Sequence, residues 1–362
     1  MVIYRKYRPK NFKEVIGQDN IIYILENEIK TDKIAHAYLF TGPRGLGKTT
    51  TARLMAKAVN CLNRKKGQSE PCNKCTVCSS VNEGRFGDLV ELDAASQTGV
   101  DNVRENIISY SRIPPTIGKY KIFVIDEAHM LSKSAFNALL KTLEEPPSYV
   151  IFILATTEVH KIPDTIISRC QRFNFRKVSL EKIVDRLEKI AKAEKIKIDK
   201  KVLQSVAVRS EGCVRDAESL FNQIFALGGK EITLEEASLV IPLSQTNLII
   251  EFLEMIFEKK DSKAVALVNQ LMNEGIDLEQ FSSDLISFLR KLILIKIGAI
   301  NDDLYWQQDE SNLKEAEKLV KTVDLERLIE IIEGFIKTKA QFGYSPIPQL
   351  PIELAVLKLC TG

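Results

Sequence analysis

The chain has 362 residues, of which 45% are hydrophobic and 27% are charged. This is the length and composition of a globular protein with roughly two or three domains. It excludes the classes of small disulfide-stapled scaffolds and disordered chains. The 51 basic and 48 acidic residues leave a net charge of +3, too small to indicate nucleic-acid or membrane binding by overall charge. No apolar run approaches the roughly 18 residues that span a bilayer, and the start lacks a secretory signal, so we expect a cytoplasmic protein.

The first half of the chain alternates short apolar runs with helical patterns. The runs, rich in Val, Ile and Phe, lie at 37–40, 88–93, 121–126, 149–155 and 171–175. Runs that are apolar on both faces are typical of buried parallel strands joined by helical crossovers. We therefore predict an α/β domain with a parallel sheet and flanking helices, the layout of a nucleotide-binding domain.

From residue 179 onward the pattern is helical. Ser179 is a candidate N-cap for a first helix, and a stripe from Ala217 to Phe225 stops at Gly228 and Gly229. Pro242 indicates a linker, and from Gln245 to the end further apolar stripes predict an all-helical domain. Those stripes are Phe252, Leu253 and Ile256, then Phe281, Leu285, Phe288, Leu289 and Leu292, then Leu325, Leu328, Ile332 and Phe335.

The segment GPRGLGKT, which ends at Thr49, fits the phosphate-binding loop pattern. It follows the first predicted strand and precedes a helical segment, as that pattern requires. Its glycines, Gly42, Gly45 and Gly47, allow main-chain N–H groups to point at phosphate oxygens, while Lys48 would neutralise the β and γ phosphates and Thr49 would hold Mg²⁺. The alternative is a glycine-rich turn without a ligand, but eight positions and both flanks match.

Polar residues follow two of the predicted strands at the sheet edge where ligands bind in α/β folds. Asp126 is suited to Mg²⁺, and Glu127 to orienting a water for attack on a γ-phosphate; the alternative is a solvated strand end. His129 is either a third participant or a structural residue, the latter being more common for a lone His. Thr156 and Thr157 either sense the γ-phosphate or cap the strand end.

Four of the seven cysteines, Cys61, Cys72, Cys75 and Cys78, lie in one short stretch. Paired two-residue gaps allow four thiolates to converge on a tetrahedral Zn²⁺, and a closed shell predicts a structural role. An iron–sulfur cluster is an alternative, although the trailing Pro of the common cluster motif is absent. Free cysteines are the remaining alternative.

Several segments together carry a resemblance to a known family. They are YRKYRPKNFKEVIGQ, HAYLFTGPRGLGKTTTARLMAKAVNC, the four cysteines, ELDAASQTGVDNVREN, VIDEAHMLSKSAFNALLKTLEEPP, ILATTEVHKIPDTIISRCQRF and EGCVRDAESL, and they span most of residues 1–220. In them the chain resembles the γ/τ subunits of the bacterial DNA polymerase III clamp loader, a family of AAA+ ATPases. The resemblance implies a motor subunit in which ATP binding and hydrolysis drive opening and loading of a ring-shaped sliding clamp onto primed DNA during replication, without polymerising DNA itself.

The resemblance also implies domains and partners. It indicates an AAA+ P-loop ATPase domain over 1–178 with a zinc module at about 61–80, a helical lid over 179–242, and an all-helical oligomerisation collar over 243–362. Several copies of the chain would form a pentameric ring with delta-type and delta-prime-type subunits. The ring would act on the sliding clamp and primer–template DNA, at replication forks in the bacterial cytoplasm and away from membranes.

Site roles follow from the same resemblance. Arg169, which by itself reads as an ordinary exposed arginine, is similar to an arginine finger that acts on ATP held by the neighbouring subunit. Arg215 resembles a lid sensor of nucleotide in its own chain, and Thr157 a first sensor. The residues expected to contact ATP are Arg8, Pro9, Val15 and Ile16 on the adenine side, Gly42, Pro43, Arg44, Gly45, Leu46, Gly47, Lys48, Thr49, Thr50 and Arg215.

The chain departs from the family in two places. Family members often carry basic side chains in the loop after ELDAAS, whereas this chain has Gln97 and Gly99, so Thr98, Arg104 and main-chain N–H groups at helix N-termini are the candidates for DNA contact. Longer members continue into segments that bind helicase and polymerase. We do not expect those activities of these 362 residues.

Three other functions compete with this interpretation. A branch-migration helicase would displace strands without a clamp. A non-catalytic ring scaffold would have a degenerate site, which the intact phosphate loop and acidic pair argue against. A metal-dependent DNA-binding module would present charge from Arg64, Lys65 and Lys66, which are more typical of a solvated loop.

Overall fold

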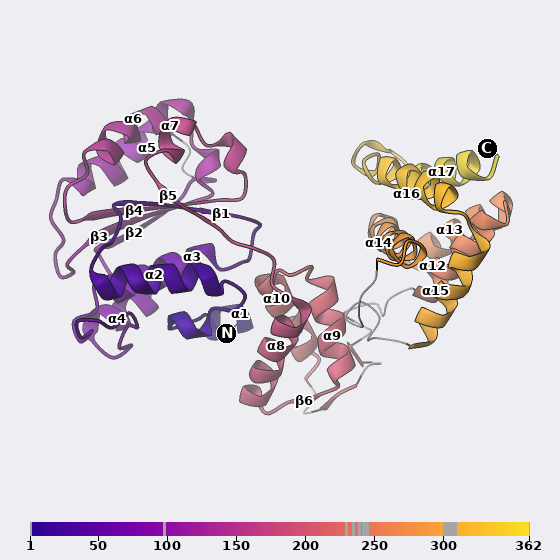
Figure 1. Cartoon of the computed structure of the whole chain (residues 1–362), viewed down its shortest axis with the longest axis horizontal. Helices are drawn as coiled ribbons and strands as arrows, with labels where there is room; N and C mark the ends of the chain where they lie inside the picture. Colours follow the sequence, from indigo (N-terminus) through magenta and orange to yellow (C-terminus); the bar gives the residue numbers. More distant parts are fainter. Residues whose placement is uncertain are drawn as a thin grey trace. The chain divides into compact units, whose positions relative to one another are not determined.

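The computed structural model in Figure 1 divides into two compact units, Met1–Ile241 and Pro242–Gly362. The structure describes residues 2–96, 99–228, 231–233, 236–237, 240, 246–299 and 310–361. Of the positions singled out in the sequence, Gln97, Thr98, Gly229, Pro242 and Gln245 lie outside the described residues.

A five-stranded parallel sheet forms the centre of the N-terminal unit. The strand order is β2-β3-β4-β1-β5, with neighbouring strands parallel throughout. The strands are β1 (Ala37–Thr41), β2 (Leu89–Asp93), β3 (Lys121–Asp126), β4 (Val150–Thr156) and β5 (Gln171–Asn174). The five predicted strands are confirmed to within one residue at each end, because runs that are apolar on both faces are stable only where helices cover both faces.

Helices cover both faces of this sheet (Figure 1). On one face α2 (Asp19–Thr31) and α3 (Lys48–Val59) pack on alternate strand residues such as Phe40, and on the other α5 (Val100–Val103), α6 (Lys133–Glu144) and α7 (Asp164–Ile167) pack on residues such as Leu39. Alternation follows from the two-residue period of a strand. Shorter helices are α1 (Ile3–Lys6), α4 (Thr76–Asn82), a π-helix over Arg104–Ser109, and 3-10 turns at Phe12–Glu14, Ala128–Met130 and Val159–Lys161.

Three helices follow the sheet and share their own apolar core. They are α8 (Leu180–Glu194), α9 (Lys200–Arg209) and α10 (Val214–Phe225). The predicted helical region is confirmed, but two short strands, β6 (Lys197–Ile198) and β7 (Glu231–Ile232), were not predicted because two residues carry no periodicity. Ser179 occupies the N-cap position of α8, as predicted, although its side chain accepts no capping hydrogen bond.

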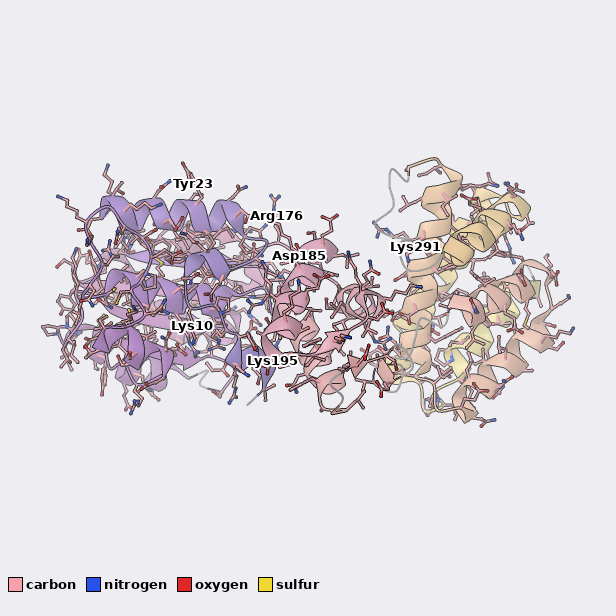
Figure 2. All side chains as sticks on the ribbon, turned by 90° about the horizontal axis from the view of Figure 1, so that it is seen from below. Lys10, Tyr23, Arg176, Asp185, Lys195 and Lys291 are labelled. Atoms are coloured by element: carbon pink, nitrogen blue, oxygen red, sulfur yellow. The ribbon has the colours of Figure 1, made fainter. Side chains whose placement is uncertain are left out.

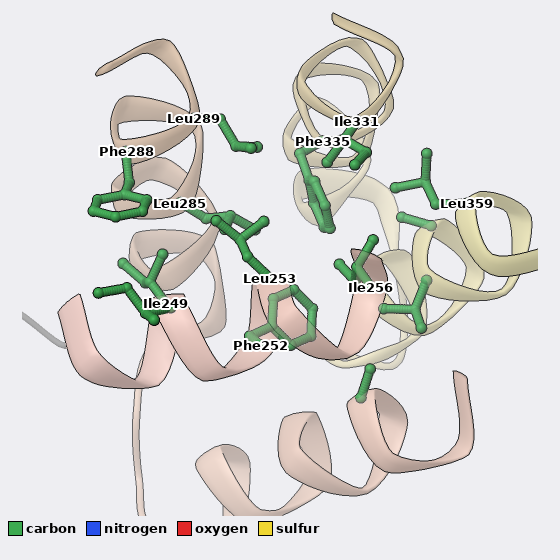
Figure 3. Close-up of a cluster of buried hydrophobic side chains, with 14 of the residues drawn as sticks. Ile249, Phe252, Leu253, Ile256, Leu285, Phe288, Leu289, Ile331, Phe335 and Leu359 are labelled. Carbon is green, nitrogen blue, oxygen red and sulfur yellow. The ribbon is translucent and has the colours of Figure 1, made fainter. Parts of the chain in front are cut away.

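Every secondary-structure element among the described residues of the C-terminal unit is a helix. Its helices are α12 (Thr246–Phe257), α13 (Asp261–Asn273), α14 (Leu278–Lys296), α15 (Glu310–Thr322), α16 (Leu325–Lys339) and α17 (Leu350–Thr361), with a 3-10 turn at Phe342–Tyr344. Figure 3 shows the core, in which the Phe252 ring lies 5.5 Å from that of Phe281 and 6.0 Å from that of Phe335. In the predicted stripe on α16, Leu328 and Phe335 are buried in this core, Ile332 packs against it and Leu325 is half-buried. Ile331, which the stripe did not include, is fully buried as well.

Among the described helices, none combines the length and the apolar character needed to cross a bilayer.

Candidate functional site

A cavity of about 730 Å³ opens in the N-terminal unit at the carboxyl ends of the strands. The segment before α2, the loop after β1, the ends of β2 and β3, and helices α8 and α10 all contribute to its lining. Of the residues predicted to contact ATP, the cavity wall contains Arg8, Pro9, Val15, Ile16, Arg44, Gly45, Leu46, Gly47, Lys48, Thr49, Thr50 and Arg215. The structure thus brings together segments that lie about 200 residues apart in the chain.

The loop after β1 has the tight curvature that its glycines allow. Gly42 adopts φ +135°, and a Cβ there would lie 2.4 Å from the Phe175 carbonyl oxygen. The loop closes around Lys48, whose ammonium donates hydrogen bonds to the carbonyl oxygens of Gly42 at 2.6 Å and Pro43 at 2.8 Å. Burial lowers the pKa of Lys48, while the carboxylates of Glu127 and Asp126 act in the opposite direction.

Thr49 and the acidic pair after β3 meet at the floor of the cavity. The Thr49 hydroxyl donates to Asp126 Oδ2 at 2.7 Å, and the Glu127 main-chain N–H donates to Asp126 Oδ1 at 3.0 Å. Glu127 itself has a left-handed backbone, with φ +46°, which is an uncommon conformation for a non-glycine residue. Hydroxyl and carboxylate oxygens side by side are the donor set that Mg²⁺ prefers, so these residues fit that ion.

The two threonines at the carboxyl end of β4, Thr156 and Thr157, have different contacts. The Thr157 hydroxyl donates to Glu127 Oε2 at 3.1 Å, so it is in contact with the acidic pair. The Thr156 hydroxyl accepts the main-chain N–H of Glu158 at 3.0 Å and contacts His129 Nδ1 at 3.0 Å, as expected for a strand-end cap. The His129 side chain keeps 7% of its surface exposed, and its ring contacts both carboxylates nearby, with Nε2 3.2 Å from Glu158 Oε1 and Nδ1 3.5 Å from Glu127 Oε2. His129 therefore lies beside the acidic pair as well as at the strand end.

Helix α10 reaches the phosphate loop directly. The Arg215 main-chain N–H donates to the Gly45 carbonyl oxygen at 3.3 Å, and the Cys213 thiol donates to the Arg44 carbonyl oxygen at 3.4 Å. The Arg215 guanidinium carbon lies 5.2 Å from the ring centroid of Tyr4, which is cation–π geometry. The lid sensor predicted at Arg215 therefore lies in the cavity wall, stacked on the N-terminal segment.

Sequence reasoning missed several charged residues of the wall. Arg186 on α8 pairs with Glu218 on α10 at 3.0 Å and also donates to a main-chain carbonyl of the N-terminal segment. Arg53 and Glu91 form a second pair, across α3 and β2. Glu218 follows Arg215 by three residues on one helix face, a spacing that could have drawn attention to it, whereas the other partners are joined only by the fold.

Arg169 does not line this cavity. Its guanidinium pairs with Glu144 at the end of α6 and donates to the Thr165 carbonyl oxygen at 2.7 Å. The side chain keeps 32% of its surface exposed. Within one chain, the structure therefore does not bring Arg169 to the residues that would hold ATP.

The four cysteines converge as their spacing predicts. The Sγ atoms of Cys61, Cys72, Cys75 and Cys78 all lie within 4.8 Å of one another. Cys72 Sγ and Cys78 Sγ are 3.9 Å apart, close to the edge of about 3.8 Å expected for a tetrahedron with Zn–S bonds of about 2.3 Å. Burial by itself would raise the pKa of Cys72, but main-chain N–H groups of Lys74 and Cys75 donate to its sulfur and hold that pKa at about 6. The cluster fits zinc.

The basic residues beside the cysteines differ in how they are held. Arg64 donates to the main-chain carbonyls of Ala58, Ile29 and Gln68, so its guanidinium is tied to the fold. Lys65 and Lys66 are exposed, as a solvated loop would have them. In the other candidate region, Arg104 is exposed and lies 4.0 Å from Asp101.

Three family models match successive parts of the chain. They are "DNA polymerase III, delta subunit" over residues 17–179, "DNA polymerase III clamp loader subunit, ATPase lid domain" over 182–230, and "DNA polymerase III subunits gamma and tau domain III" over 232–362.

Curated relatives match nearly the whole chain. The gamma subunit of DNA polymerase III from Buchnera aphidicola is 32% identical over 362 residues, covering 100% of this chain and 99% of the relative. The tau subunit from Bacillus subtilis is 39% identical over 99% of this chain, which spans 63% of that relative, and the Escherichia coli tau subunit is 34% identical, with 55% of it covered. Among solved structures, Thermotoga maritima RuvB is similar with 18% identity, a TM-score of 0.49, and coverage of 70% of this chain and 80% of that one.

Proposed function

The chain belongs to the family of DNA polymerase III gamma and tau subunits, and from this membership we propose that it is an ATPase motor subunit of the clamp loader. ATP binding and hydrolysis would drive the opening of a ring-shaped sliding clamp and its loading onto primed DNA. The observation that carries the proposal is the convergence of Lys48, Thr49, Asp126 and Glu127 on one cavity that lid helices also line. A non-catalytic scaffold would have no need for all four.

The phosphate loop would bind the triphosphate. Its main-chain N–H groups and the N-terminus of α3 favour an anion. Lys48 already has two oxygen acceptors, the carbonyls of Gly42 and Pro43, and charged phosphate oxygens are stronger acceptors than carbonyls. ATP would therefore take the ammonium from the loop, so that binding also changes the contacts of the loop itself.

Thr49 and Asp126 are the residues that would hold Mg²⁺ with the nucleotide, because their oxygens lie 2.7 Å apart at the cavity floor. The bound ion supplies neutralisation of the phosphate charge. The main-chain N–H of Glu127 keeps the Asp126 carboxylate oriented by donating to its second oxygen. The oxygens that would bind the ion are thus already held in place before the nucleotide binds.

Glu127 would orient and polarise the attacking water, which then attacks the γ-phosphorus while the bond to the β-phosphate oxygen breaks. Thr157 donates to one oxygen of Glu127 and so links the end of β4 to the carboxylate. The same contact allows Thr157 to report changes at the γ-phosphate. This is the first-sensor role that we propose for it.

Arg169 would complete the site of a neighbouring copy in the ring. Its pairing with Glu144, outside the cavity of its own chain, supports this role over one in its own site. Negative charge that develops on the γ-phosphate would remain only partly stabilised until the neighbour supplies the guanidinium. Assembly of the ring would therefore control hydrolysis.

The base and sugar would lie between the N-terminal segment and the lid. Arg8, Pro9, Val15 and Ile16 provide a mixed apolar and polar wall there. Arg215, stacked on the Tyr4 ring and hydrogen-bonded through its main-chain N–H to the phosphate loop, would sense the nucleotide from the lid. We propose the domain limits 1–178, 179–242 and 243–362 on the same basis.

The cysteine cluster would hold a structural Zn²⁺ through Cys61, Cys72, Cys75 and Cys78. Bound zinc supplies a cross-link between the end of α3 and the start of α4. A complete shell of four thiolates leaves no open position for a substrate. The role that we propose for it is stabilisation of the fold.

The partners are proposed from the family. Several copies of the chain would assemble with delta-type and delta-prime-type subunits into a five-membered ring through the helical C-terminal unit, and the ring would act on the sliding clamp and primer–template DNA at the replication fork. Arg104 is the described side chain that we propose for DNA contact.

The experiment that tests the proposed function measures ATP hydrolysis by the chain with primed DNA, with and without a sliding clamp and partner subunits. We expect stimulation that requires all three components. Full-rate hydrolysis by the isolated chain, indifferent to partners, would contradict the proposal. Strand displacement without a clamp would instead favour a branch-migration motor.

A further inference from the structure

Residues 8–16, which we call the N-terminal strap, have contacts in two directions. The two ends of the strap, Arg8 and Pro9 on one side and Val15 and Ile16 on the other, line the cavity. The middle of the strap contacts the segment 61–86 that contains the four cysteines, which we call the cysteine module. The strap is thus in contact with the proposed nucleotide pocket and with the proposed metal site at the same time.

The first contact is made by Glu70 of the cysteine module. Its carboxylate accepts the main-chain N–H of Phe12 at 2.9 Å and that of Lys13 at 3.2 Å. These two N–H groups belong to the first residues of the 3-10 turn Phe12–Glu14, which have no partner inside the turn itself. A residue 58 positions away therefore caps the strap, and Phe12 is anchored in the core below with 1% exposure.

The second contact is made by Lys57, which lies on α3, the helix that begins at the phosphate loop. The side chain is buried, and its ammonium donates to the Lys10 carbonyl oxygen at 2.7 Å, to Asn73 Oδ1 at 2.7 Å and to Asn82 Oδ1 at 2.9 Å. An ammonium has three protons, so all of its donors are used. The Lys57 Nζ atom thereby joins the strap to the cysteine module. Figure 2 labels Lys10, the strap residue of this contact.

The contacts of Lys57 depend on how the cysteine module is folded around its sulfur cluster, and Glu70 lies two residues before Cys72 in the same module. Asn73 lies directly after Cys72 and has a left-handed backbone with φ +56°, and the next two main-chain N–H groups, those of Lys74 and Cys75, donate to the Cys72 sulfur. Asn82 ends α4, the helix that Cys75 caps by accepting the main-chain N–H of Cys78. The positions of these two amides are therefore set by the same backbone that carries three of the four sulfur ligands.

From these contacts we propose that the cysteine module positions the strap, with Glu70 and Lys57 as positioning residues, so that metal occupancy of the module and ATP binding in the pocket are coupled. This inference rests on the proposed function, since it requires that the cavity bind ATP. Coupling between two sites is reciprocal in free energy. A metal that holds the strap should strengthen ATP binding, and ATP should slow release of the metal by a comparable factor.

The test compares ATP affinity of the full chain and three variants, using a fluorescent ATP analogue and zinc content measured on the same samples. We expect Glu70→Ala to weaken ATP binding about 5- to 10-fold, at the lower end of typical coupling between two sites, while zinc stays bound. Glu70→Gln keeps one acceptor oxygen and should give an intermediate value. Glu83→Ala, whose carboxylate pairs with Arg85 on the surface of the same module, is the matched control and should bind ATP as the parent chain does.

Two further readouts separate positioning from a loss of fold. In a reconstituted ring, Glu70→Ala should raise KM for ATP about 5- to 10-fold and change kcat less than about 2-fold, because the strap touches no reacting atom. In the unsubstituted chain, ATP should slow zinc release to a chromogenic chelator about 5- to 10-fold, and this protection should disappear in Glu70→Ala.

The outcomes separate the inference from the proposed function. Unchanged ATP affinity in Glu70→Ala with zinc retained, or zinc release that ignores ATP in the unsubstituted chain, would overturn the inference and leave the proposed function standing. Failure of the unsubstituted chain to bind ATP would overturn both. If Glu70→Ala does not fold, Glu70→Gln and zinc release from the unsubstituted chain still decide the question.

Discussion

The proposed nucleotide pocket and the cysteine cluster differ in how far apart in the chain their residues lie and in how open each site is. The cluster draws its four sulfurs from residues 61–78 and packs them within 4.8 Å of one another in a small apolar core. The pocket draws its lining from residues 4–218 and leaves a cavity of about 730 Å³ with charges of both signs on its walls. A closed, saturated site stabilises a fold, whereas an open site with charged walls can bind a substrate and change its own contacts.

The largest effect that would sharpen this comparison is expected at Arg169, which lies outside both sites of its own chain. Arg169→Ala should leave ATP affinity unchanged and lower DNA-stimulated hydrolysis of the assembled ring by about 10³-fold, because a guanidinium supplied by a neighbour stabilises the charge of the transition state. Steady-state hydrolysis with primed DNA and clamp measures this. Arg172→Ala, three residues further along, is the matched control, and normal stimulated turnover of the Arg169 variant would refute the assignment.

Within the pocket, Glu127→Gln should lower turnover by about 10²- to 10³-fold and retain ATP binding, because the amide keeps the size of the side chain and loses the base. Single-turnover hydrolysis together with an ATP titration measures both quantities. The melting temperature should stay within a few degrees of the parent value. A variant that hydrolyses ATP normally would show that another group orients the water.

Lys48→Ala should weaken ATP binding about 100-fold, since the charged hydrogen bonds to two phosphates are lost. The fold should persist because Lys48 contacts the carbonyls of its own loop rather than a distant element. Titration with labelled ATP measures the affinity, with Lys65→Ala as a control from an exposed loop. Unchanged binding would count against the phosphate-loop assignment.

Substitution in the cysteine cluster should lower the stability of the fold, whereas substitution in the pocket should lower ATP binding or turnover and leave the fold intact. Cys75→Ser should release the metal and lower the melting temperature of the chain by about 5 °C or more, because metal binding in a structural site contributes directly to folding. Cys170→Ser, at a half-buried thiol outside the cluster, should keep the metal. If Cys75→Ser retained one zinc per chain, the cluster would not be a site that needs all four thiolates, and the contrast with the open pocket would fail.

The smallest effect is expected from Tyr4→Ala, which removes the ring under Arg215. A cation–π contact outside a desolvated core contributes about 0.5–1 kcal/mol, so ATP affinity should fall about 2- to 5-fold with kcat nearly unchanged. Tyr4→Phe keeps the ring face and should restore the parent affinity. Equal losses in both variants would mean that the ring does not position Arg215.

Much of the fold could be predicted because its signals are local. The five strands are apolar on both faces, and the helical stripes from Phe252 to Phe335 repeat at helical spacing, so their existence follows from the period of each element. The exceptions have physical reasons. The strands β6 and β7 are too short to carry a period. Ile331 and Ile332 are identical apolar neighbours on one helix, so packing decides which of the two is buried.

The amino-acid sequence by itself determined the chemistry of the loop that ends at Thr49, the acidic pair after β3 and the cysteine spacing, since each depends on residues close together in the chain. Only the tertiary structure decided which residues from distant parts of the chain contact these local motifs. No periodicity or residue spacing in the sequence predicts three of these features. They are the stacking of Arg215 on Tyr4, the position of Arg169 outside the pocket of its own chain, and the hydrogen bonds of Lys57 to two separate segments. Such contacts arise when the sheet order and helix packing bring far parts of the chain together, and local preferences carry no information about that.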